Sequence, residues 1–209
     1  MNNRRSFIIG IKSTKLSLNE KIFLKKYKPW GVILFSRNIK NIKQTSNLTF
    51  SIRKIFKDMK YPILIDQEGG RINRLKKIIS FDNLTSEFFG TKFANNHKEF
   101  KFFYKLFIDK TSYLLKLIGA NINTVPVLDL RIKGSSNVIG DRSFSNDPKI
   151  VSKIGDYCIQ YFQKNGIGTV IKHIPGHGRA KVDSHYFTPT INKKQSYLLK
   201  NDFIAFKNK

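Results

Sequence analysis

Residues 62–71, Pro62-Ile-Leu-Ile-Asp-Gln-Glu-Gly-Gly-Arg71, decide the fold class of this chain. Their first four positions are apolar without alternation, and a charged, glycine-containing segment follows directly at Asp66. A short unbroken apolar run is typical of a parallel strand that is buried on both faces. In sheets of parallel strands, functional residues gather at the C-terminal strand ends. The stretch therefore predicts an α/β protein with a polar site that begins at Asp66.

Four other segments share this strand-like pattern, and helical segments lie between them. The five predicted strands are residues 7–11, 31–35, 62–65, 121–128 and 169–173. The predicted helices are residues 18–28, 43–57, 98–118, 149–164 and, near the end, about 195–207. Strands that alternate with helices form βαβ units with right-handed crossovers. No Gly/Ser linker or break in composition divides the chain, so we expect one domain over residues 1–209.

Two of the predicted helices carry start signals. Ser17 precedes the first helix and Glu20 follows three residues later, which is the pattern of a capping box. Asp147 stands before Pro148, as an N-cap followed by proline at the first helical position. Both pairs indicate where their helices begin.

The chain is strongly basic. Its 209 residues contain 39 Lys and Arg against 14 Asp and Glu, which gives a formal net charge of +25. Such a domain can bind polyanions by releasing counterions. However, only nine of the basic residues are Arg, whereas base reading and bidentate phosphate contacts use the planar guanidinium group. We therefore favour compositional drift over a solvated surface, and nucleic-acid binding remains an alternative.

Cysteine content and hydropathy limit the location of the protein. Cys158 is the one cysteine, which excludes a disulfide framework and a cysteine-only zinc site. The longest apolar runs have about five residues, far fewer than the roughly 20 that cross a bilayer. The apolar stretch after Arg4 and Arg5 is also too short for the core of a secretion signal. We expect a cytoplasmic protein with no membrane partner.

Polar sequences follow three of the predicted strands. They are Asp66-Gln-Glu-Gly-Gly-Arg71 after the third, Asp129 and Ile139-Gly-Asp-Arg-Ser-Phe144 after the fourth, and Lys172-His-Ile-Pro-Gly-His-Gly178 after the fifth. Because parallel strands end at one edge of a sheet, these side chains are expected to converge. Gly69 and Gly70 would let the backbone turn tightly beneath a ligand.

Histidines are concentrated near the end of the chain. Three of the four, His173, His177 and His185, lie within thirteen residues, and Asp183 lies two residues before the last of them. A Pro-Gly pair between the first two prevents them from sharing one helical face as zinc ligands do. A metal site and ordinary loop histidines remain alternatives. We favour acid/base chemistry, because histidine titrates near neutral pH and a neighbouring carboxylate stabilises its protonated form.

Five motifs carry a resemblance to a known family. In chain order they are Gly31-Val-Ile-Leu-Phe-Ser-Arg-Asn38, Pro62-Ile-Leu-Ile-Asp-Gln-Glu-Gly-Gly-Arg71, Pro126-Val-Leu-Asp129, Ile139-Gly-Asp-Arg-Ser143 and Lys172-His-Ile-Pro-Gly-His-Gly-Arg-Ala-Lys-Val-Asp-Ser-His185. Together they resemble the bacterial glycoside hydrolase family 3 β-N-acetylhexosaminidases of the peptidoglycan-recycling type. The resemblance runs from about residue 7 to the end of the sequence, and the last motif is highly specific to that group.

This resemblance implies a fold, an activity and a set of site residues. The fold is a (β/α)8 TIM barrel, and the activity is cleavage of terminal β-linked N-acetylglucosamine from cell-wall turnover fragments with retention of configuration. His185 would be the acid/base catalyst and Asp183 its partner. The residues that would bind the saccharide are Asp66, Arg74, Arg142, Lys172 and His173. No metal and no cofactor are expected.

The chemistry of these residue types agrees with such roles. Asp66 can accept hydrogen bonds from adjacent sugar hydroxyls, and the basic side chains supply charge-assisted donors to hydroxyls and to the acetamido carbonyl. The alternative interpretation is structural. In that case Asp66 and Glu68 form a carboxylate pair that is bonded to Arg71 or Arg74.

The sequence departs from the family pattern in one respect. Retaining glycosidases use a second carboxylate as nucleophile, and the resemblance implies an Asp-Asp-Leu-Ser-like motif after the seventh strand. These residues contain no such segment and only five predicted strands, so we expect a barrel truncated to about its first five βα units. Either a complementary C-terminal fragment supplies the remainder, or the chain is a non-catalytic sugar-binding remnant. We expect little or no hydrolysis by the 209 residues alone.

Overall fold

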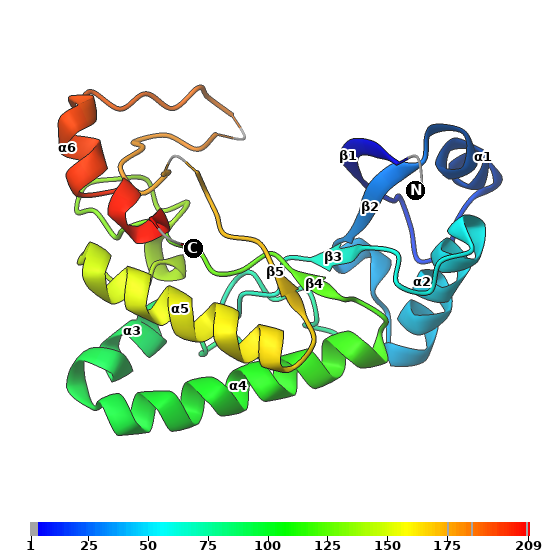
Figure 1. The fold of residues 1–209 in the computed structure, drawn as a ribbon, viewed down its shortest axis with the longest axis horizontal. Helices are drawn as coiled ribbons and strands as arrows, with labels where there is room; N and C mark the ends of the chain where they lie inside the picture. Colours follow the sequence, from blue (N-terminus) through cyan, green and yellow to red (C-terminus); the bar gives the residue numbers. More distant parts are fainter. Residues whose placement is uncertain (1–3, 175, 185, 208) are drawn as a thin grey trace.

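A five-stranded parallel sheet forms the centre of the molecule (Figure 1). The computed structural model describes residues 4–174, 176–184, 186–207 and 209. The strands are β1 (Arg5–Gly10), β2 (Pro29–Leu34), β3 (Ile63–Ile65), β4 (Ile122–Asn123) and β5 (Gly168–Thr169). They stand in the sheet in chain order, and each pairs in parallel with the next. The predicted α/β class is therefore confirmed.

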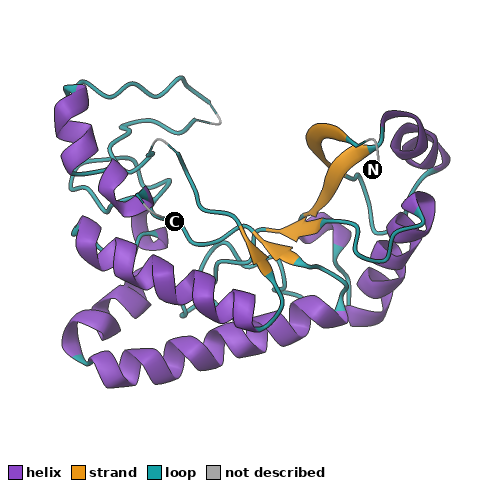
Figure 2. Cartoon of the chain, viewed as in Figure 1, coloured by secondary structure: helices purple, strands orange, loops and turns teal. Residues whose placement is uncertain are grey.

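Helices connect the strands and lie around the sheet (Figure 2). The α-helices are α1 (Leu18–Tyr27), α2 (Ile42–Phe56), α3 (Ser86–Asn95), α4 (His97–Leu117), α5 (Pro148–Lys164) and α6 (Gln195–Lys200). Three short 3₁₀ segments are η1 (Ser36–Asn38), η2 (Gly140–Arg142) and η3 (Phe203–Phe206). Because each crossover leads to the adjacent strand, the connectivity is that of a (β/α) barrel. Within the described residues, no helix is both long and apolar enough to span a bilayer.

Both predicted helix starts are confirmed. The Ser17 hydroxyl accepts a hydrogen bond from the Glu20 backbone N–H at 3.2 Å, and the Glu20 carboxylate accepts one from the Ser17 N–H at 2.8 Å. Asp147 accepts a hydrogen bond from the Lys149 N–H at 2.7 Å, with Pro148 in the first turn of α5. The caps satisfy backbone donors that the first helical turn leaves without partners.

The last two strands are shorter than the sequence predicts. Residues 121–128 and 169–173 were expected to be extended throughout, whereas β4 and β5 contain two residues each. Pro126 has no backbone N–H to donate to a ladder, which interrupts regular pairing at that point. Pairing returns beyond it as a single parallel bridge between Val127 and Lys172.

Helix α3 was not predicted, because its sequence signal is weak. Gly90 lies in its middle and lowers its intrinsic helix propensity. The tertiary structure explains this glycine. A Cβ at position 90 would lie 1.7 Å from the carbonyl oxygen of Phe144, so only glycine lets α3 approach this loop.

The continuous helix predicted for residues 195–207 is wrong. The segment divides into α6 and η3, and the division lies at Asn201 and Asp202. The Nε–H of Arg179 donates a bifurcated hydrogen bond to the two oxygens of the Asp202 carboxylate, at 2.8 and 2.7 Å. This long-range ion pair lies at the point where the helix ends, and no local sequence pattern predicts the ion pair.

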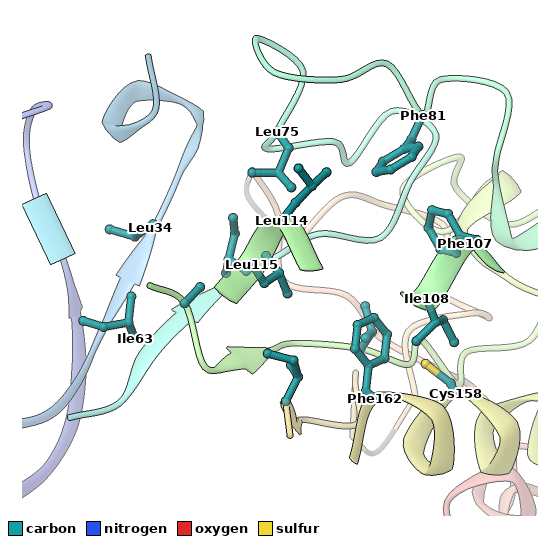
Figure 3. Close-up of a cluster of buried hydrophobic side chains, with 14 of the residues drawn as sticks. Leu34, Ile63, Leu75, Phe81, Phe107, Ile108, Leu114, Leu115, Cys158 and Phe162 are labelled. Atoms are coloured by element: carbon teal, nitrogen blue, oxygen red, sulfur yellow. The ribbon is translucent and has the colours of Figure 1, made fainter. Parts of the chain in front are cut away.

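The apolar core is formed by the sheet and helices α1 to α5. Figure 3 shows side chains of α4 and α5 in one cluster, among them Ile108, Cys158 and Phe162. All three are at most 2% exposed. Burial raises the pKa of the Cys158 thiol to about 12, so the thiol stays protonated at neutral pH. The cluster joins the helices to the strand ends that carry the polar residues.

Replacement of a core residue in α4 should cost far more stability than replacement of an exposed one. We expect Ile108→Ala to lower the free energy of unfolding by about 2–5 kcal/mol, because it opens a cavity. The matched control is Leu106→Ala in the same helix, whose side chain is 56% exposed, and we expect a change within about 0.5 kcal/mol. Urea denaturation measures both. Equal losses would show that the packing of α4 is not as described.

Candidate active site

The polar site lies where β3, β4 and β5 end side by side (Figure 1). Asn123, at the end of β4, is fully buried and holds the segment that follows β3. Its side-chain oxygen accepts a hydrogen bond from the Gln67 N–H at 2.9 Å, and its side-chain N–H donates to the Gln67 carbonyl at 2.9 Å. These two bonds fix the backbone from which Asp66 and Glu68 project.

A glycine pair turns the chain back after these carboxylates, as the sequence predicts. Gly69 and Gly70 have φ angles of 95° and 54°, in the left-handed region that favours glycine. A Cβ on Gly69 would lie 2.2 Å from the Leu84 carbonyl oxygen, so the turn also requires its lack of a side chain.

Asp66 is held by three partners. Lys172 Nζ lies 3.1 Å from Oδ1, an Arg74 guanidinium nitrogen lies 3.4 Å from Oδ2, and the Thr124 hydroxyl donates to Oδ1. Burial alone would raise the pKa of Asp66, but Lys172, Thr124 and Arg74 together outweigh it and hold the pKa below its usual value. Asp66 is therefore ionised at neutral pH and remains an acceptor.

Glu68 lies deeper and joins two cations. Arg142 donates to it bidentately, with nitrogen–oxygen distances of 2.8 and 3.0 Å, and Lys172 Nζ lies 2.5 Å from Oε1. Its side chain is only 3% exposed. Burial opposes ionisation, but the Arg142 hydrogen bonds and the Lys172 charge prevail, so the pKa of Glu68 is lowered. The same pairing raises the pKa of Arg142 despite its burial.

The structural alternative of a carboxylate pair is correct in part. Asp66 does contact Arg74, but Glu68 contacts Arg142 and Lys172 instead of Arg71. Arg71 pairs with Asp141 at 2.8 Å and also donates to carbonyls of residues 137–139. It thereby ties the loop before Arg142 to the turn after β3.

His173 is oriented by a buried carboxylate. Its Nδ1 lies 2.6 Å from Oδ2 of Asp129, which is 1% exposed, and its Nε2 lies 3.4 Å from an Arg142 nitrogen. In the neutral ring, Nδ1–H donates to Asp129 and Nε2 is left as an acceptor. Asp129 also accepts hydrogen bonds from the backbone N–H groups of His173 and His177. One carboxylate therefore fixes the backbone at both His173 and His177.

Next to His173 lies a cavity of about 380 Å³ that is lined in part by His177, Ala180 and Ile191. Both ring nitrogens of His177 are buried, and neither has a hydrogen-bond partner among the described residues. The predicted catalytic His185 lies outside the described residues. Its predicted partner Asp183 is half-buried, and its carbonyl accepts hydrogen bonds from the N–H groups of residues 186 and 187.

The structure thus brings together all five predicted binding residues, with other groups that the sequence analysis assigned no binding role. Glu68 and Asp129 each stand in a quoted motif, and their position at a strand end is the signal that could have found them. Thr124 has no such signal, since an isolated threonine is uninformative. In the described part of the chain, no group of three or more His, Cys, Asp or Glu residues could hold a metal ion.

The fold and the position of the site define a barrel-type α/β protein with its polar residues at the carboxyl ends of parallel strands. The family described as the glycosyl hydrolase family 3 N terminal domain matches residues 8–209. The chain belongs to this family, as the sequence motifs predict.

Relatives and solved structures agree with this membership. A β-hexosaminidase of Hydrogenovibrio crunogenus is 36% identical over 178 residues, which cover 85% of this chain and 49% of that protein. One of Thioalkalivibrio sulfidiphilus is 30% identical over 200 residues, with 95% and 56% covered. NagZ from Neisseria gonorrhoeae in complex with N-trifluoroacetyl-D-glucosamine aligns with a TM-score of 0.88 at 28% identity, covering 97% of this chain and 59% of that one. The chain spans about half the length of the curated relatives it matches.

Removal of the buried charge of Glu68 should destabilise the fold. We expect Glu68→Gln to lower the free energy of unfolding by about 3–5 kcal/mol, because Arg142 and Lys172 lose their shared counter-charge. The control is Glu87→Gln, which removes an exposed pair with Arg131 and should cost at most about 1 kcal/mol. Urea denaturation measures the free energy of unfolding of both variants. A cost for Glu68→Gln no larger than the control would mean that the network does not hold the fold.

The depressed pKa values of Asp66 and Glu68 predict acid sensitivity. Their usual values are 3.8 and 4.5, and the folded values lie below them. Each group therefore adds stability that is complete above its unfolded pKa and is lost as the pH falls through its folded pKa. We expect the free energy of unfolding to decrease below about pH 5, with a smaller decrease in Glu68→Gln. If the free energy of unfolding of the wild-type protein and that of Glu68→Gln decreased equally between neutral and acid pH, this expectation would be contradicted.

Proposed function

We propose that this chain forms the sugar-binding and acid/base part of a β-N-acetylglucosaminidase. The observation that carries the proposal is the ionic network in which Asp66, Glu68, Arg142 and Lys172 meet at the ends of parallel strands. The relatives are named β-hexosaminidases, and a structurally similar NagZ is described in complex with an N-acetylglucosamine analogue. The substrate we propose is a saccharide with terminal β-linked N-acetylglucosamine from cell-wall turnover, and the compartment is the cytoplasm.

Three of the proposed binding groups are partly open to solvent. The side chains of Asp66, Arg74 and His173 are 20%, 25% and 37% exposed, whereas those of Arg142 and Lys172 are each 13% exposed. In this proposal the more exposed groups make the first contacts with the sugar. Asp66 accepts from hydroxyls, while the cations behind it donate to oxygen atoms and keep it ionised.

His173 contributes through its orientation. Because Nδ1 of His173 lies 2.6 Å from the Asp129 carboxylate, the direction of Nε2 is set before any sugar arrives. A donor or acceptor that is fixed in advance loses little conformational freedom when a ligand binds. We propose that Asp129 is the positioning residue for His173.

The proposed acid/base pair is His185 with Asp183. A protonated imidazole beside a carboxylate suits donation of a proton to the glycosidic oxygen, followed by activation of water. Support comes from the spacing of the two residues and from the family membership. The chain contains no Asp-Asp-Leu-Ser-like segment, so in this proposal the nucleophile of a retaining mechanism comes from outside these residues, for example from a complementary fragment.

Binding of N-acetylglucosamine by the purified 209-residue chain tests the proposal. We expect Asp66→Asn to weaken binding by about tenfold or more, because it removes a charged acceptor from the site. The matched control is Asp141→Asn, which alters an exposed pair with Arg71 and should leave affinity within about twofold. Isothermal titration calorimetry gives both affinities, and unfolding curves confirm that each variant is folded. Equal affinities in the two variants would remove Asp66 from the binding site.

The same protein distinguishes binding from catalysis. We expect no turnover of a chromogenic N-acetylglucosaminide above background, since a nucleophile is needed for the retaining reaction. Turnover that disappears in His185→Ala would contradict the proposed absence of hydrolysis and support the acid/base role. Sugar binding without turnover supports the proposal as stated.

A further inference from the structure

Helix α4 is apolar on two opposite faces. Its inner face is buried, as expected for a helix that packs on a sheet. Its outer face carries Phe102, Leu106, Tyr113 and Leu117, which are 65%, 56%, 57% and 38% exposed. At about 100° per residue these four side chains fall within an arc of about 60°. We call them the outer stripe, and it faces solvent where a surface helix normally presents polar residues.

Lysines border the outer stripe on both sides. By the same helical geometry, Lys98, Lys105 and Lys116 lie along one side, and Lys110 lies along the other. The Nζ of Lys110 is 5.9 Å from the ring centroid of Tyr113. All four lysines are exposed. By the same geometry Glu99 lies at one edge of the stripe and Asp109 at the other, so the border contains four lysines and two carboxylates. The stripe is therefore a row of large apolar side chains whose border carries a net positive charge.

The carboxylates of α4 are already engaged by cations. Glu99 pairs with Lys92 of α3 at 2.7 Å, and Asp109 pairs with Lys105 within α4. The helix surface thus keeps a positive balance, on a chain whose formal net charge is +25. A partner that complements this face has a negatively charged surface layer, which meets the lysines, and an apolar interior below it, which receives the apolar side chains.

We propose that the outer stripe of α4 binds the surface of a lipid bilayer that contains anionic headgroups. From Phe102 to Leu117 the stripe is about 22 Å long, long enough to lie in the interface with its apolar side chains below the headgroups. The bordering lysines can extend along it and place their charges among the phosphates. Figure 1 shows α4 along the lower edge of the molecule, away from the open side above the sheet.

Other partners fit this face less well. Protein interfaces are depleted of lysine relative to the rest of the surface, whereas four exposed lysines border this stripe. Nucleic-acid readers rely on arginine, and α4 contains none. The expectation of no membrane partner rested on the lack of a segment that spans a bilayer, and a helix that lies on a membrane surface needs no such segment.

Co-sedimentation with lipid vesicles tests the proposal at physiological ionic strength. We expect the protein to sediment with vesicles of phosphatidylcholine and phosphatidylglycerol, and not with phosphatidylcholine alone. The double variant Phe102→Ser/Leu106→Ser should lower the partition coefficient by about tenfold or more, because two large apolar side chains no longer insert. The matched control is Leu18→Ser/Ile22→Ser on α1, where the side chains are 72% and 55% exposed, and its partition should not change.

A charge series separates a specific face from general attraction of a basic protein. Lys98→Gln/Lys116→Gln removes two charges beside the stripe, and Lys25→Gln/Lys26→Gln removes two exposed charges on α1. We expect a clearly larger loss of vesicle binding in the first variant. Equal losses in both would overturn the proposal, because they would mean that only the net charge matters.

Fluorescence reports whether the stripe enters the lipid. The chain has one tryptophan, so Trp30→Phe/Phe102→Trp places the only indole in the stripe. We expect its emission to shift to shorter wavelength with anionic vesicles. Sedimentation without this shift, or no sedimentation of the wild-type protein, would overturn the proposal. Self-association through the stripe, seen by analytical ultracentrifugation without vesicle binding, would assign the face to a second copy of the chain instead.

Discussion

The site depends on one buried carboxylate, Glu68, which holds Arg142 and Lys172 together. A charge removed from water is costly unless it is paired and fully hydrogen-bonded. Here Glu68, Arg142 and Lys172 can be buried because each of these charges is paired with a charge of opposite sign. Lys172 extends the network to Asp66, so the more exposed carboxylate is held by a cation that the buried Glu68 also binds. Ion pairs hold this cluster of charged side chains together, and the packed apolar core surrounds it.

A second carboxylate, Asp129, has the same organising role for the segment after β5. It accepts hydrogen bonds from the backbone and ring of His173 and from the backbone of His177. Glu68 and Asp129 are each nearly inaccessible to solvent, and both follow strands of the parallel sheet. His173 is thus paired with a buried carboxylate that fixes its direction, and Asp66 is paired with a lysine that a buried carboxylate also holds.

Local sequence patterns were reliable where local physics decides the structure. The capping box at Ser17, the Asp147 cap and the parallel strand before Asp66 all follow from hydrogen bonding and burial within a few residues. Patterns failed where a distant segment decides. Helix α3 requires Gly90 because of a carbonyl more than fifty residues away, and the helix predicted for 195–207 ends where Asp202 meets Arg179.

The sequence by itself determined the α/β class, the family and the residues that collect at the strand ends. These features depend on apolar runs, turn residues and motif order, which are properties of the amino-acid sequence itself. The tertiary structure alone decided which cation meets which carboxylate: Arg142 with Glu68 over 74 positions, and Lys172 with Asp66 over 106. It also showed that α4 exposes an apolar face. The physical reason is that ion pairs and burial depend on distances in space, which sequence spacing does not specify.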